Sequence, residues 1–110
     1  MTTPTIPASE VAEVLRRIAR GDVQVRLQAG TESWYETLTG NVFFDADGWR
    51  IVIFNDCGFV DYVDSVVAPD GRTAKYEDWA QDKSAKCLNP ISMMMRTEDA
   101  PLFEKLVAAR

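Results

Sequence analysis

The middle of the chain, from Val42 to Tyr76, consists of apolar segments interrupted at short intervals by turn-forming residues. The interruptions are Asp47-Gly48, Asn55-Asp56-Cys57-Gly58 and Pro69-Asp70-Gly71. Aspartate, asparagine, glycine and proline favour tight turns, and short apolar runs between such turns are typical of antiparallel strands. The stretch therefore predicts an antiparallel meander, and no other feature constrains the fold of this chain as strongly.

The first of these turns predicts a specific strand register. Asp47-Gly48 suits a type I′ hairpin turn, which needs positive φ at both central positions. A two-residue loop there pairs Phe44 with Ile51 and Asp45 with Arg50, and the second pair is expected to form an ion pair across the strands. Apolar residues then fall on both faces of the hairpin, so we expect part of each face to be covered by a helix, a loop or a partner.

Helical patterns flank the meander on both sides. A loose tail over residues 1–7 leads to a helix that Ser9 is expected to cap and Gly21 to end. Near the other end, Asn89 and Pro90 predict the start of a short helix, and Thr97 is expected to cap a final one. Further strands are predicted over residues 23–28, 59–68 and 72–76, whereas residues 31–38 form either a loop or a strand.

These elements fit one domain, residues 1–110, because 110 residues with 46% hydrophobic content suffice for one modest core. The predicted fold class is α+β. We expect an N-terminal helix, an antiparallel β-meander of four to five strands, and a C-terminal helical region packed on one sheet face.

The charge is acidic and unevenly distributed. The chain has a formal net charge of −5, and the segment from Glu32 to Asp82 holds eleven acidic and three basic residues. Such a segment repels phosphate backbones, so no direct nucleic-acid binding is expected, whereas a protein partner with a basic surface is attracted. Arg16, Arg17 and Arg20 form a small basic patch, which we interpret as a solvated helix face.

The residue inventory excludes several kinds of chemistry. Histidine is absent from the chain, which removes nucleophilic triads, imidazole acid–base catalysis and histidine metal sites. Cys57 and Cys87 form no C-x-x-C pair, and Asp56 and Asp61 disfavour a reactive thiolate at Cys57. With no signal-like start and no spanning apolar run, we expect a soluble, reduced, cytoplasmic protein without membrane contact. No catalytic residue, metal or cofactor is predicted.

Paired carboxylates are the remaining route to catalysis or metal binding. Asp61 and Asp64 are three positions apart, which in a regular strand places them on opposite faces, so they meet only if a bulge intervenes. Asp45, Asp47 and Gly48 resemble part of a calcium loop, but the further aspartate and the distant glutamate of an EF-hand do not follow. Solvated turn residues are the simpler interpretation.

The chain also resembles a known family. The resemblance lies in Asp47-Gly48-Trp49 through Asn55-Asp56-Cys57, in Asp61-Tyr62 and in Pro69-Asp70-Gly71-Arg72, with a similar Thr2-Thr3-Pro4-Thr5 opening before a Val/Leu helix. The family consists of small uncharacterised bacterial proteins known only as a domain of unknown function. The resemblance implies a compact domain and no particular activity.

These observations favour a small acidic, non-enzymatic protein-binding module, such as an inhibitor or immunity-type partner of a basic effector protein. The residues expected to contact that partner are Asp56, Phe59, Asp61, Tyr62 and Asp64. Acidic side chains there steer encounter, and the aromatic rings supply affinity. The alternatives are a small-ligand or divalent-metal-binding domain, and a homodimer or larger homo-oligomer formed through the two-sided hairpin or a sheet edge.

Overall fold

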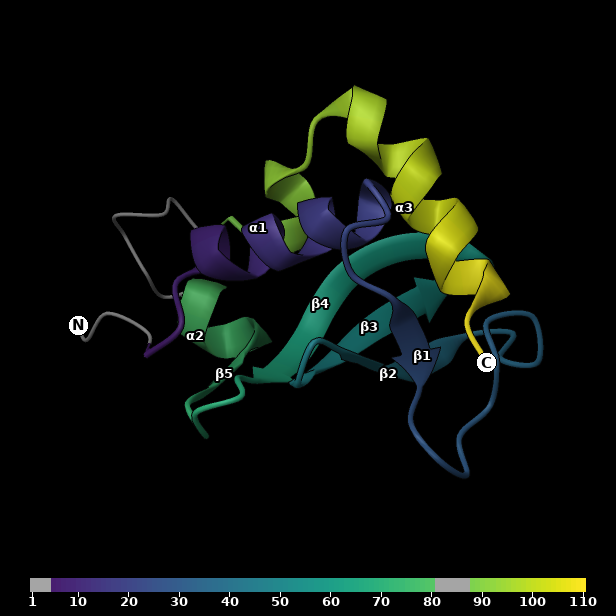
Figure 1. Cartoon of the computed structure of the whole chain (residues 1–110), viewed down its shortest axis with the longest axis horizontal. Coiled ribbons are helices and arrows are strands. Elements are labelled where there is room, and N and C mark those ends of the chain that lie inside the picture. Colours follow the sequence, from purple (N-terminus) through teal and green to yellow (C-terminus); the bar gives the residue numbers. More distant parts are fainter. Residues whose placement is uncertain (1–4, 81–87) are drawn as a thin grey trace.

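The computed structural model describes residues 5–80 and 88–110 and has the expected α+β fold (Figure 1). The elements in chain order are α1 (Ala8–Ala19), β1 (Val25–Leu27), β2 (Gly40–Ala46), β3 (Trp49–Asp56), β4 (Phe59–Val67), β5 (Thr73–Lys75), α2 (Tyr76–Ala80), the 3-10 helix η2 (Pro90–Met93) and α3 (Arg96–Ala108). The five strands form one antiparallel sheet in the order β1-β2-β3-β4-β5, which confirms the predicted meander.

The β2–β3 hairpin has the predicted turn and register. Asp47 and Gly48 have φ of 50° and 81°, and Asp45 lies opposite Arg50. The prediction of an ion pair between Asp45 and Arg50 is wrong, however, because no ion pair among the described residues includes either side chain. Asp47 instead pairs with Arg17 of α1, with Arg17 Nη2 3.1 Å from Asp47 Oδ2, so the turn is held to the helix.

β4 contains two irregularities in its pairing with β3. Val52 and Ile53 lie opposite Ser65 and Val63, which leaves Asp64 as an extra residue. The same happens one step along the strand, where Phe54 and Asn55 lie opposite Tyr62 and Val60 and Asp61 is extra. A bulge is therefore present at each of the two aspartates that sequence reasoning could bring together only through a bulge.

The N-cap of each long helix lies two residues before the residue expected to cap it. Ser9 lies inside α1, whose N-cap is Pro7, and Thr97 lies inside α3, whose N-cap is Met95. At α3 the Glu98 carboxylate accepts the Met95 N–H at 2.7 Å, so the third helical residue does the capping. The predicted end of the first helix is confirmed, because Gly21 follows it with φ of 81°.

Both long helices lie on one face of the sheet, and the core lies between them and the strands (Figure 1). Residues 31–38, for which the sequence allows a loop or a strand, contain turns and no strand. They place Trp34 in the core against Phe44 and Phe103. Trp79 of α2 is 1% exposed and donates from Nε1 to the carbonyl of Ile6 at 2.9 Å. Ile6 is itself fully buried, so the chain is anchored from this residue, within the segment expected as a tail.

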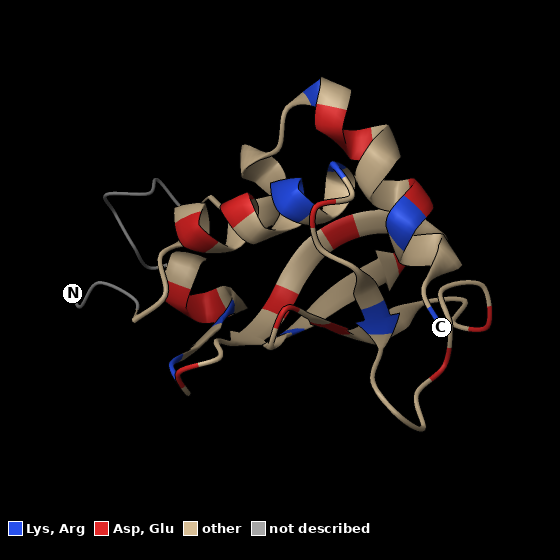
Figure 2. Ribbon diagram, in the orientation of Figure 1, with Lys and Arg blue, Asp and Glu red and all other residues tan. Residues whose placement is uncertain are grey.

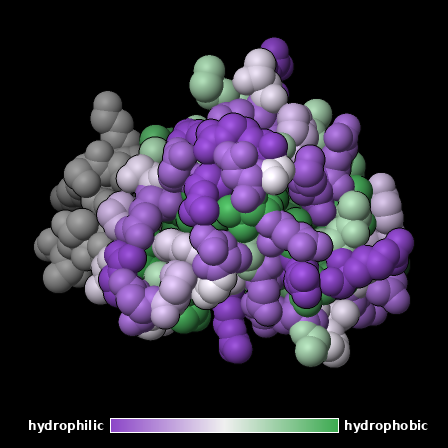
Figure 3. Space-filling model, in the orientation of Figure 1, coloured by the Kyte–Doolittle hydropathy of each residue, from purple (hydrophilic) through white to green (hydrophobic). Residues whose placement is uncertain are grey.

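The surface seen from the side of Figure 3 is mainly hydrophilic, with apolar side chains in smaller patches. No helix of the described residues has the length and apolar character needed to cross a membrane. Cys87, the second of the two cysteines that form no C-x-x-C pair, lies outside the described residues.

Candidate functional site

The sheet has one open face, which none of the described helices covers (Figure 1). Strand alternation explains which side chains it carries, because every second residue of β2 and β3 is buried under the helices and the others point away. Along β2, β3 and β4 these are Asn41, Phe43, Asp45, Arg50, Val52, Phe54, Tyr62, Ser65 and Val67. An open face normally carries polar residues, so the apolar ones among these require an explanation.

Three aromatic rings lie in contact on the open face. Phe54 and Tyr62 are partners in register, and their rings stack with centroids 5.0 Å apart and an interplanar angle of 16°. Tyr76, which follows β5, adds a third ring at 4.8 Å from that of Tyr62. Aromatic contacts of this kind contribute about 0.5–1.5 kcal/mol beyond their buried area, so they hold the rings in place on the surface.

Carboxylates surround this ring cluster. Partial burial raises the pKa of the Tyr62 hydroxyl, and the charges of Asp64, Asp61 and Glu77 raise it further. Asp61 and Asp64 belong to β4, and the acidic residues of this strand are coloured red in Figure 2. None of these three carboxylates forms an ion pair with another described residue. Within residues 5–80 and 88–110, their negative charge is therefore not neutralised by an ion pair.

Arg16 and Arg17 of α1, and Arg20 directly after it, are by contrast already paired. Arg16 is 3.2 Å from Glu98, Arg17 is 3.1 Å from Asp47 and Arg20 is 3.0 Å from Asp22. The patch expected as a solvated helix face is therefore a set of ion pairs, two of which join α1 to other elements. Its charge is thus engaged elsewhere than at the β4 aspartates, which form no ion pair with a described residue.

The five residues predicted from the sequence to contact a partner lie along the end of β3 and the first part of β4. Asp56 and Phe59 are opposite each other beside the Cys57-Gly58 turn, two register steps from Phe54 and Tyr62. Phe59 is 75% exposed. Asp61 and Asp64 occupy the two bulges. We call the following set the acidic-aromatic end of the sheet: Phe54, Asp56, Phe59, Asp61, Tyr62, Asp64, Tyr76 and Glu77.

Sequence reasoning missed three members of this set, Phe54, Tyr76 and Glu77. Phe54 was visible in the hairpin register, where it falls on the same face as Val52. Tyr76 and Glu77 reach Tyr62 only because β5 returns beside β4, and no local pattern predicts how close that return brings them.

The turn beside Phe59 is built on a buried amide. Asn55 is fully buried, and its Nδ2 donates to the carbonyls of Trp34 at 3.1 Å and Thr37 at 2.9 Å. Its Oδ1 accepts the Gly58 N–H at 2.6 Å. Asn55 thus joins the β3–β4 turn to the loop before β2, which positions the exposed residues at this end of the molecule.

A hollow of about 600 Å³ lies where the start of β4 meets η2 and the first turns of α3. Its lining is mainly apolar, with Val60, Ile91, Met94, Leu102 and Phe103, and Ser92 and Asp99 add polar groups. A smaller hollow of about 320 Å³ lies across the turn, with Tyr35, Leu38 and Cys57 in its lining, and both hollows share Gly58. Tyr35 and Leu38 are 72% and 83% exposed.

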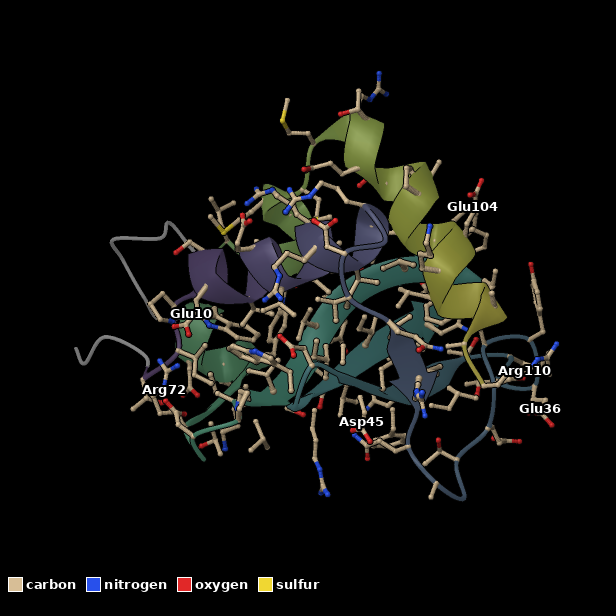
Figure 4. All side chains as sticks on the ribbon, in the orientation of Figure 1. Glu10, Glu36, Asp45, Arg72, Glu104 and Arg110 are labelled. Atoms are coloured by element: carbon tan, nitrogen blue, oxygen red, sulfur yellow. The ribbon has the colours of Figure 1, made fainter. Side chains whose placement is uncertain are left out.

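At the other end of the open face, Asp45 lies between Arg26 and Arg50 on the neighbouring strands. Figure 4 shows Asp45 on the side of the sheet away from α1 and α3. Its Oδ1 is buried and has no hydrogen-bond partner among the described residues. This end of the face carries mixed charge, unlike the acidic-aromatic end.

The arrangement can therefore attract and hold a cationic, partly apolar surface. Within residues 5–80 and 88–110, no three side chains of the histidine, cysteine, aspartate or glutamate type gather closely enough to hold a metal ion.

Comparison with the curated proteins and with the solved structures found no match. A family model described as "Domain of unknown function (DUF7693)" matches residues 5–108. The match confirms the resemblance to an uncharacterised domain family that the turn motifs indicated. Because it spans nearly the whole chain, this protein belongs to the DUF7693 family.

Proposed function

We propose that this protein is a non-enzymatic protein-binding module that docks a basic partner protein on its acidic-aromatic end. The observation that carries the proposal is the contact cluster of Phe54, Tyr62 and Tyr76 on an open sheet face, bordered by carboxylates that have no cation in the described chain. An inhibitor or immunity-type partner of a basic effector is the specific form of this function that we favour.

Two physical effects support such docking. Unpaired carboxylates on one surface raise the rate of encounter with a positively charged protein, and this effect weakens as salt screens the charges. Aromatic side chains supply affinity when a partner covers them, and Phe59, at 75% exposed, has the largest exposed fraction among the aromatic residues. Arginine on the partner adds cation–π contact with Tyr62 or Tyr76.

The test begins with capture of partners from a lysate of the source cells at low and moderate salt, followed by association kinetics with the purified partner. Asp61→Asn combined with Asp64→Asn should lower the association rate constant about three- to tenfold at low salt and flatten its salt dependence. Replacement of Phe59 by serine should instead raise the dissociation rate. Melting temperatures check that each variant folds.

A matched control removes two exposed acids outside the acidic-aromatic end, Glu32→Gln with Glu104→Gln, which changes the net charge equally. If this control slowed association as much as the Asp61 and Asp64 pair did, net charge rather than this surface would account for binding. Recovery of only the protein itself would point to self-association, which sedimentation velocity then measures.

A further inference from the structure

The hollow between the β3–β4 turn and α3 has the size of an organic binding site but lacks the groups that orient a small molecule. Its volume of about 600 Å³ falls within the range of about 300–1,000 Å³ typical of ligand sites. Such sites normally add several convergent polar groups. Here the polar side chains of the lining are Ser92 and Asp99.

The backbone of Gly58, at the border of the hollow, is already hydrogen-bonded within the protein. The Gly58 N–H donates to Asn55 Oδ1 at 2.6 Å, and the Gly58 carbonyl accepts Trp34 Nε1 at 3.2 Å. The Gly58 N–H is therefore engaged, and its carbonyl already accepts one of the two hydrogen bonds that it can accept. What remains is an apolar depression that suits hydrocarbon side chains, whose binding needs no oriented partner.

The charges at its border favour one kind of occupant. Asp99 lines the hollow, Asp56 and Asp61 flank the strand residues that form its rim, and none of the three forms an ion pair with a described residue. Arg16, which pairs with the neighbouring Glu98, does not neutralise them. A segment that is apolar at its centre and basic on both sides complements this border.

The rim is continuous with the acidic-aromatic end, because Gly58 and Phe59 belong to the hollow and Phe59 also lies opposite Asp56 on β3. We propose that the hollow receives an apolar anchor from the basic partner protein, one or two large hydrocarbon side chains with lysine or arginine on either side. This inference rests on the proposed function for the identity of the partner, and it defines the sequence type that the partner presents.

Three capped hexapeptides of known sequence test the two proposals separately, by isothermal titration with the wild-type protein. RRSSRR reports the charge attraction alone, RRLFRR adds the apolar anchor, and EELFEE keeps the anchor with the opposite charge. We expect RRLFRR to bind about tenfold more tightly than RRSSRR, and EELFEE not to bind. Equal affinity of RRLFRR and RRSSRR overturns the anchor and leaves the charge proposal intact, whereas tight binding of EELFEE overturns the charge proposal and leaves the anchor.

Ala100→Trp is designed to fill the hollow, since Ala100 lines it from α3, and should abolish the advantage of RRLFRR without affecting RRSSRR. Thr97→Trp is the matched control, because Thr97 is exposed on the same helix and outside the lining. Methyl chemical shifts of Ile91, Met94 and Leu102 in the wild-type protein give a reading that does not depend on a variant. An advantage of RRLFRR that leaves these shifts unchanged places the anchor elsewhere and overturns the inference.

Discussion

Cys57 holds a backbone conformation that cysteine rarely adopts. Its φ is 51°, and with Gly58 at 98° it forms a two-residue turn with positive φ at both positions. The residue is exposed, and its contacts with Thr39 compensate in part, because the Cys57 N–H donates to Thr39 Oγ1 at 3.2 Å and Sγ lies 3.3 Å from the same hydroxyl. The conformation comes from the turn rather than from the thiol.

Replacement of Cys57 by asparagine is therefore expected to stabilise the protein. Asparagine tolerates positive φ better than other residues with a side chain, and Asn-Gly is a preferred pair for this turn. We expect the free energy of unfolding to rise by about 0.5–1 kcal/mol in urea denaturation. Cys57→Ala is the control, since it removes the thiol and keeps the unfavourable φ. If Cys57→Ala raised the free energy of unfolding by the same amount, loss of the thiol rather than relief of the backbone would explain the effect.

Residue-scale reasoning from the sequence found turns but not the buried amide that supports one of them. The sequence places Asn55 in a turn motif, because asparagine before Asp-Cys-Gly is a local signal. Its bonds to the carbonyls of Trp34 and Thr37 depend on where a loop about twenty residues earlier is folded. No pattern within the turn contains that information.

At the scale of elements, one side chain extends the sheet where a strand is missing. β5 pairs with β4 only from Ser65 to Val67. At Val63 the side chain of the buried Asn89 forms the hydrogen bonds that a neighbouring strand would form. Its Oδ1 accepts the Val63 N–H at 2.8 Å and its Nδ2 donates to the Val63 carbonyl at 2.9 Å. The same Oδ1 accepts the Ile91 N–H at 3.1 Å and so caps η2, which confirms the predicted helix start.

Asn89→Ala should consequently cost more than a helix cap alone. A cap is worth about 0.5–2 kcal/mol, and the variant also leaves the N–H and carbonyl of buried Val63 unpaired. We expect a loss of about 2–4 kcal/mol in the free energy of unfolding, measured by urea denaturation. Asn41→Ala on the open face is the comparison and should change stability little. A cost below about 1 kcal/mol for Asn89→Ala would mean that the β4 edge is satisfied in another way.

The elements that local chemistry determines were predictable, and those that depend on packing were not. The register of the β2–β3 hairpin follows from two residues, Asp47 and Gly48. The start of α3 did not follow from Thr97, because Glu98 can cap the helix from inside and so shift its first residue. The hollow and the contact between Tyr62 and Tyr76 need several elements in their final places, so the candidate site was predictable only in its β3–β4 part.

At the scale of the whole molecule, one arginine joins the start of the chain to the far end of the sheet. Figure 4 shows Glu10 and Arg72 together, and Arg72 Nη2 lies 2.7 Å from Glu10 Oε2. The same guanidinium donates to the Thr5 carbonyl at 3.1 Å and to Asp70 Oδ2 at 2.8 Å. It therefore connects α1 and the segment before it to the β4–β5 turn.

This network predicts how stability depends on acid. The hydrogen bond from Arg72 lowers the pKa of Glu10 below its ordinary value of 4.5, and backbone hydrogen bonds lower the pKa of Asp70, Glu36 and Glu98. A carboxyl whose pKa is lower in the folded state stabilises the protein above its unfolded pKa. That stabilisation is lost as the pH falls through the folded pKa. Melting temperature should therefore fall on acidification below about pH 5.

Glu10→Gln removes one part of this dependence. We expect a melting temperature lower by about 1–5 °C at pH 7 and a shallower decline between about pH 5 and pH 3. Scanning calorimetry across this pH range measures both. Glu104→Gln, which removes an exposed acid without an ion pair in the described chain, should leave the profile unchanged. If melting temperature fell with pH equally steeply in Glu10→Gln and in the wild-type protein, Arg72 would not hold the Glu10 carboxylate in solution.

The two bulges of β4 also bear on how this family can vary in length. Deletion of one residue from a regular strand moves every following side chain to the opposite face. Deletion of Asp61 or Asp64 would instead leave Val60 next to Tyr62, or Val63 next to Ser65, each already on its proper face opposite β3. A relative that lacked either residue would therefore keep the whole sheet and lose one carboxylate, so the fold can be inherited without this part of its acidic surface.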